Sequence, residues 1–252
     1  MEGSFRGWPN GIKAAVSLSF DDGPPSQLDK AVPILDQHGI KGTFYVNPVP
    51  GPRFERHVAR WQAAMENGHE LANHTVSHPC SGNFGFVSAE RALELWSLER
   101  IEADVLQAEE ALRRWLRGIK EHSFAYPCGQ TFVGRGSERR SYVPVIARHF
   151  RVARGLGESA NDPRICDLHC LSSWMVVGVT GEQMISMLQP AIEAGHWAIF
   201  CFHGIGGDHH RVDVEPFEEL VRYLAEQAPQ IWTATVQEVG LAVAEIQQKA
   251  RS

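Results

Sequence analysis

Residues 14–24 read AAVSLSFDDGP, a run of seven small or apolar residues that ends in two adjacent carboxylates and a Gly-Pro turn. Such a run, bounded by turn residues, is typical of a buried strand in a parallel sheet. Similar runs predict strands at 14–20, 42–46, 70–73, 123–126, 151–153, 169–172, 197–202 and 231–233. Stretches of helical period predict helices at 28–38, 56–67, 89–116, 141–149, 182–194, 215–227 and 236–249. Strands that alternate with helices indicate βαβ units, in an open doubly wound sheet or a barrel, and seven or eight units favour an α/β barrel.

The composition bounds the class of protein. The chain has 252 residues, of which 43% are hydrophobic, and no composition shift marks a linker, so we expect one domain over 1–252 with a core at about 13–243. Its formal charge of −6 makes nucleic acid a poor partner. The apolar runs are too short to span a membrane, and residues 1–11 hold no apolar run typical of a signal peptide. Five cysteines without dense pairing argue against a disulfide scaffold, and we expect a reducing, cytoplasmic location. The sequence gives no indication of oligomeric state.

Two segments carry residues suited to metal chemistry. Asp21 and Asp22 directly follow the first predicted strand, where one carboxylate can bind a cation while its neighbour accepts a proton. A turn that caps the next helix is the structural alternative. His74 and His78 follow the third predicted strand, and on a helical turn their spacing places both imidazoles on one face. An isolated pair of this spacing is more often a surface coincidence, but with a carboxylate it completes a three-ligand catalytic site.

A third candidate is His203, which ends the apolar run 197–202. A capping or core histidine is the structural alternative. However, three separate strands deliver aspartate and histidine side chains to the same end of the predicted barrel. This coincidence favours a functional site.

Together these segments resemble a known family, the polysaccharide deacetylases with the NodB homology domain, which form carbohydrate esterase family four. Residues 20–24 (FDDGP) are similar to the family's first motif, residues 74–78 (HTVSH) to its second, and Phe202-His203 to its fifth. The resemblance runs from about residue 13 to about residue 243. It implies a distorted (β/α) barrel of about seven parallel strands.

By position, the resemblance assigns roles to the motif residues. It implies that Asp22, His74 and His78 are metal ligands and that Asp21 is the general base for the attacking water. His203 is then the general acid for the leaving amine or alcohol. The ligand set suits a divalent ion, with zinc as the first choice and cobalt, nickel, iron or manganese as alternatives.

The third motif differs from the family pattern. The family typically has Arg-Pro-Pro-Tyr-Gly, whereas this chain has Ala125 in the place of the arginine that orients the catalytic aspartate. Arg151 and Arg154, near the next strand, are the candidates to replace it. Pro127 and Gly129 fit the family pattern, so the resemblance implies that the backbone N–H of Cys128 serves as an oxyanion donor. Asp167 is a candidate for orienting His203, the role of the family's fourth motif.

Aromatic and sulfur-containing residues complete the candidates. Trp174, which follows a predicted strand, is the tryptophan that we expect near a substrate cleft, and Tyr126 in the altered third motif is expected to shape the pocket. Cys80 is either an additional soft ligand or, as the preferred interpretation, a small core or loop residue.

The resemblance implies a metal-dependent hydrolase that removes N- or O-acetyl groups from a carbohydrate. Two alternatives remain open. One is a hydrolase of non-peptide C–N bonds in a small molecule, and the other is a catalytically silent carbohydrate-binding relative.

Overall fold

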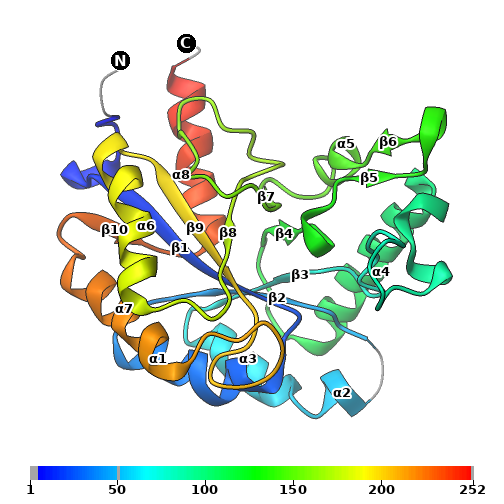
Figure 1. The fold of residues 1–252 in the computed structure, drawn as a ribbon, viewed down its shortest axis with the longest axis horizontal. Coiled ribbons are helices and arrows are strands. Elements are labelled where there is room, and N and C mark those ends of the chain that lie inside the picture. The colour runs from blue at the N-terminus through cyan, green and yellow to red at the C-terminus, as the bar shows by residue number, and fades with distance from the viewer. Residues whose placement is uncertain (1–4, 50–51, 251–252) are drawn as a thin grey trace.

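A parallel sheet forms the centre of the molecule. The computed structural model describes residues 5–49 and 52–250. Within them, the sheet contains β1 (Ala14–Asp21), β2 (Thr43–Val46), β3 (Glu70–Asn73), β4 (Phe124–Ala125), β7 (Ala153–Arg154), β8 (Trp174–Met175), β9 (Trp197–Phe202) and β10 (Ile231–Thr233). Seven strands follow the order β7-β4-β3-β2-β1-β9-β8, while β10 pairs with the first residues of β1. The sheet curls into a half-barrel (Figure 1), which confirms the predicted α/β fold with about seven parallel strands.

Helices link the strands and cover the sheet. The α-helices are α1 (Val32–Gln37), α2 (Pro52–Glu55), α3 (Val58–Glu66), α4 (Leu98–Trp115), α5 (Val143–Ile146), α6 (Gly181–Ala194), α7 (Val214–Glu226) and α8 (Val236–Lys249). A π-helical turn, η2 (Gln27–Ala31), precedes α1. The 3₁₀ turns are η1 (Pro9–Gly11), η3 (Ala89–Arg91), η4 (Leu93–Leu95), η5 (Pro127–Gly129) and η6 (Gly136–Glu138). A small antiparallel pair, β5 (Phe132–Val133) and β6 (Arg140–Ser141), lies outside the main sheet.

The alternation of side chains along β1 separates core from site. All eight residues of β1 are buried. Val16, Leu18 and Phe20 belong to the hydrophobic cluster formed with α1, α6 and α7. On the opposite face, Ala15 packs in a cluster with residues of α8, at the start of the strand. Because strand side chains alternate, Asp21 points to the same face of the sheet as Ala15. Helix α8 packs on this face near Ala15, at the start of β1, whereas Asp21 is at the other end of the strand.

Two predicted elements differ in the structure. The long helix predicted at 89–116 begins at Leu98, because Ser97 caps it by accepting a hydrogen bond from the N–H of Arg100. The preceding residues form two 3₁₀ turns, held by the bond from the N–H of Leu93 to the carbonyl of Cys80. Residues 169–172 do not form the predicted strand, and only a single β-bridge joins Leu171 to Arg154. The strand that pairs with β9 on this side is β8, which lies just after the predicted segment.

The cysteines also depart from expectation. Cys80 and Cys128 form a disulfide across a sequence separation of 48, while Cys166, Cys170 and Cys201 are free. Cys80 is a buried loop residue, as the preferred interpretation has it, but the sequence analysis did not foresee its pairing with Cys128, because only the fold brings these two distant loops together. The cytoplasmic location stays a prediction, and the disulfide removes the cysteine argument for it.

No helix of the described residues is both long and apolar enough to cross a membrane.

Candidate active site

The turn after β1 sends its two carboxylates in different directions. Asp21 is the last residue of β1, and Asp22 adopts a left-handed backbone with φ of 71°. Gly23 follows with φ of 63°, and a Cβ there would lie 3.1 Å from Val46 Cγ1. This local conformation places the Asp22 carboxylate beside His74 and His78, while Asp21 faces Arg154.

Asp22, His74 and His78 converge on one point. Asp22 Oδ1 lies 3.5 Å from His74 Nε2 and 3.2 Å from His78 Nε2. The Nδ1 of His74 lies 2.9 Å from the carbonyl of Ala125, which only accepts, so this nitrogen donates and Nε2 keeps its lone pair. Burial lowers the pKa of His74 to about 4, so this imidazole is neutral at neutral pH. A neutral imidazole is the form that binds a metal.

These residues fit a divalent metal ion. The three ligand atoms lie within 4.8 Å of one another. Asp22 Oδ1 is buried and has no hydrogen-bond partner among the described residues. A buried carboxylate oxygen without a donor, between two imidazole nitrogens, is a donor set that can hold a divalent ion.

The loop that carries His74 and His78 is not helical. Thr75 and His78 have φ of 63° and 48°, so the expected helical turn is wrong. The loop is shaped instead by Asp104 of α4, whose carboxylate accepts bonds from the N–H groups of Val76 and Ser77 at 3.1 Å each. Asp104 is a supporting residue that sequence reasoning missed, because only the fold brings α4 to this loop.

Arg154 supplies the guanidinium that the third motif lacks. Its Nη2 donates to Asp21 Oδ1, and both side chains are buried. Ala125 and Arg154 are paired residues on the neighbouring strands β4 and β7, so the arginine enters from the adjacent position in the sheet. Burial alone raises the pKa of Asp21, but the charges of Arg154, His74 and His203 outweigh it and lower the pKa.

A buried thiol also contacts Asp21. Cys201 Sγ donates to Asp21 Oδ2 at 3.3 Å, and Arg154 Nη1 lies 3.5 Å from the same sulfur. Burial raises the pKa of Cys201 far above its usual range, so the thiol keeps its proton. Cys201 was not among the sequence candidates. The signal for it is the alternation of β9, because Cys201 lies two residues before His203.

His203 lies next to this group but lacks the expected partner. Its Nε2 is 3.9 Å from Asp22 Oδ2, and its buried Nδ1 has no hydrogen-bond partner among the described residues. Burial lowers the pKa of His203. Asp167 does not reach it, since this exposed carboxylate accepts a bond from the N–H of His169, two residues away, and shapes a local turn.

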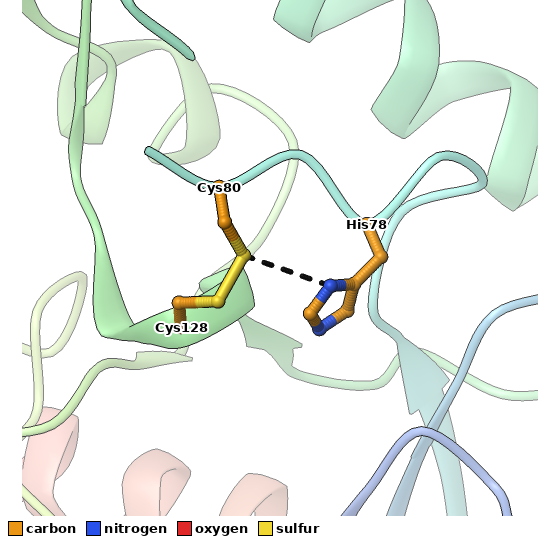
Figure 2. A group of neighbouring side chains, drawn as sticks. All are labelled: His78, Cys80 and Cys128. Carbon is orange, nitrogen blue, oxygen red and sulfur yellow. Dashed lines mark hydrogen bonds between the residues drawn. A yellow bond between two sulfur atoms is a disulfide. The ribbon is translucent and has the colours of Figure 1, made fainter. Parts of the chain in front are cut away.

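The disulfide links the loop that follows His74 and His78 to the third motif. Figure 2 shows the imidazole of His78 directed toward the disulfide, with Nδ1 3.6 Å from Cys80 Sγ. Cys128 is in the left-handed region with φ of 54°, inside the turn η5. Cys80 lies two residues after His78, so the disulfide ties the loop that carries His78 to Cys128, whose backbone N–H is the expected oxyanion donor.

Neither aromatic candidate is among the residues that line the cavity beside Asp22 and His78. Tyr126 is fully buried, and its hydroxyl donates to the carbonyl of His169 at 2.7 Å. Trp174 is partly buried on β8, with its ring 5.8 Å from that of Phe200. A cavity of about 740 Å³ does adjoin the site, lined by Asp22, His78 and others that include Trp61.

Known proteins show clear similarity to this chain. A sequence profile of the polysaccharide deacetylases matches residues 9–135, about half of the 252 residues. A peptidoglycan-N-acetylglucosamine deacetylase of Bacillus cereus is 27% identical over 110 residues, which are 43% of this chain and 44% of that protein. A chitooligosaccharide deacetylase of Sinorhizobium fredii is 31% identical over 100 residues, 39% of this chain and 40% of that protein. The chain therefore matches less than half the length of either relative.

Solved structures show the same fold over almost the whole chain. A protein of Mycobacterium smegmatis, proposed to be a polysaccharide deacetylase, superposes with a TM-score of 0.65 and 15% sequence identity. The superposition covers 98% of this chain and 94% of that protein.

Proposed function

The chain belongs to the polysaccharide deacetylase family, and from this premise we propose that it is a metal-dependent hydrolase that removes N- or O-acetyl groups from a carbohydrate. One observation carries the proposal: Asp22, His74 and His78 converge beside a buried pair of Asp21 and Arg154. A catalytically silent binding protein requires neither the convergence of Asp22, His74 and His78 nor the buried ion pair of Asp21 and Arg154.

Asp22, His74 and His78 hold the metal ion in this proposal, with zinc as the preferred ion. A bound divalent ion supplies Lewis-acid activation of a water and of the acetyl carbonyl. With only these three residues as protein ligands, the ion would have room to bind water and substrate, as in catalytic sites.

Asp21 is the general base. Arg154 keeps its carboxylate ionised, and the Cys201 thiol donates to its other oxygen, which together fix its orientation. The free lone pairs of this carboxylate take the proton of the attacking water.

His203 is the general acid and protonates the departing amine or alcohol. Its Nε2 lies on the Asp22 side, near the proposed reaction centre. The backbone N–H of Cys128 supports the developing oxyanion. In a serine protease, one such oxyanion-hole donor contributes about 2.7–4 kcal/mol to catalysis.

The proposed substrate is an acetylated sugar. The adjoining cavity of about 740 Å³ lies within the range of about 300–1,000 Å³ typical of ligand pockets. The similarity to deacetylases of peptidoglycan and chitooligosaccharides supports acetylated amino sugars as the first substrates to test.

The test is acetate release by metal-stripped protein, before and after addition of Zn²⁺ or Co²⁺. The panel contains acetylated chito-oligosaccharides, peptidoglycan fragments, acetylated xylan and small acetylated sugars. We expect release from at least one class, only after metal is added. Tight metal binding without acetate release from any of them overturns the carbohydrate substrate and favours hydrolysis of a small-molecule amide.

A further inference from the structure

A glycine-rich loop after β9 brings a fourth histidine to the site. Within the loop, the N–H of Gly204 donates to the carbonyl of His209 at 3.1 Å. Two bonds attach the loop to the segment after β1: the N–H of Ser26 donates to Asp208 Oδ2 at 2.9 Å, and the N–H of Ile205 donates to Ser26 Oγ at 3.1 Å. The position of His209 is thus fixed relative to the turn that carries Asp22.

His209 contacts Asp22 Oδ2, the carboxylate oxygen that does not face His74 and His78. Its Nε2 lies 2.7 Å from Asp22 Oδ2, whereas His74 and His78 face Oδ1. A carboxylate only accepts, so His209 Nε2 carries a proton and donates it in this bond. The distance is that of a hydrogen bond between a ring N–H and a carboxylate.

We propose that His209 is a positioning residue for Asp22, an inference that rests on the metal site of the proposed function. By holding Oδ2, His209 fixes the rotation of the carboxylate and keeps Oδ1 directed at the two imidazoles. Without this bond the Asp22 carboxylate can adopt several orientations. Binding of the ion then has to restrict it to one orientation, and this loss of conformational entropy weakens metal affinity. Outer partners of this kind typically change metal affinity by about 10- to 100-fold.

The geometry favours positioning over direct ligation. The ring of His209 lies against Asp22 Oδ2, whereas His74 and His78 face Oδ1. His209 is also half-exposed at the cavity, with a side-chain exposure of 50%, whereas the exposure of His74 is 1%.

The experiment compares His209→Ala, His209→Gln and the neighbouring control His210→Gln. His210 packs its ring 5.2 Å from that of His203 and forms no described bond with Asp22. The first readout is the Zn²⁺ dissociation constant, obtained by competition with a chromophoric chelator. The second is the visible absorption spectrum of the Co²⁺-loaded protein, which reports the number and type of ligands.

We expect His209→Ala to bind Zn²⁺ about 10- to 100-fold more weakly. His209→Gln keeps a donor and should recover part of this loss, while His210→Gln should match the wild type. All Co²⁺ spectra should keep the wild-type band positions and intensities.

Two results overturn the inference alone. One is wild-type affinity in His209→Ala, and the other is a Co²⁺ spectrum that loses a nitrogen ligand in that variant, which would make His209 a direct ligand. Failure of the wild type to bind metal overturns the proposed function as well, so the two failures are distinguishable.

Discussion

The pair of Arg154 and Asp21 gives the sharpest prediction for a single substitution. In Arg154→Met the aspartate stays buried but loses its compensating charge, together with the stacking of the guanidinium 4.9 Å from the ring of Tyr45. Removing one partner of a buried ion pair costs about 3–5 kcal/mol of folding free energy. This is a large part of the total of about 5–15 kcal/mol for a typical domain.

The pH dependence of this loss has a definite sign. The pKa of Asp21 is lowered in the folded protein, so its ionised form contributes stability above its unfolded pKa and loses it as pH falls through the folded pKa. The gap between wild type and Arg154→Met should therefore be widest near neutral pH and shrink in acid. The Arg154 guanidinium helps to hold the pKa of Asp21 below its usual range, so the acidic limb of the kcat/KM profile should move to higher pH in Arg154→Met.

Denaturant unfolding of the metal-stripped protein measures the free energy of unfolding. The dependence of kcat/KM on pH reports the ionisation of Asp21, the proposed general base. The double variant Asp21→Asn/Arg154→Met tests the same point if the single variant folds poorly, because it removes the uncompensated charge and should recover part of the loss. Ala125→Arg/Arg154→Ala moves the arginine to the paired residue on β4 and should retain part of the activity. An Arg154→Met variant within about 1 kcal/mol of wild type, with an unchanged acidic limb, refutes the reasoning.

Two further predictions concern parts of the molecule outside the ligand set. Replacing Cys80 and Cys128 together by serine should cost about 4 kcal/mol, because the disulfide closes a loop with a sequence separation of 48; chemical denaturation checks this, and a loss below about 1 kcal/mol contradicts it. Buried His122 lies 2.8 Å from the Glu109 carboxylate, and although burial lowers its pKa, the bond and charge of Glu109 outweigh this and raise the pKa. Its stabilising effect is therefore full below its unfolded pKa and lost as pH rises through the folded value, so His122→Gln should destabilise the protein more at pH 5.5 than at pH 9; an equal loss at both pH values argues against the pair.

The sequence predicts the ends of strands better than the contacts between them. The apolar runs before Asp21, His74 and His203 identified the strands, because buried parallel strands need continuous hydrophobic residues. Parallel strands place their carboxyl ends together, so these residues were expected at one end of the sheet, and the structure places them there.

Register and loop conformation were beyond the sequence pattern. The choice between Arg151 and Arg154 depends on the pairing of β7 with β4, which no local pattern encodes. The disulfide and the support from Asp104 likewise join segments distant in sequence. The spacing of His74 and His78 indicated a helical turn, but left-handed residues in the loop bring the rings together without one.

The most direct test of the account is to measure bound metal per chain and acetate release in Asp22→Ala and Asp21→Asn, beside the wild type. The account predicts that Asp22→Ala loses both stoichiometric metal and activity, because it removes a ligand. Asp21→Asn should keep its metal and lose most turnover, because it removes only the base. Stoichiometric metal in Asp22→Ala, or a wild-type rate in Asp21→Asn, would contradict the central claim.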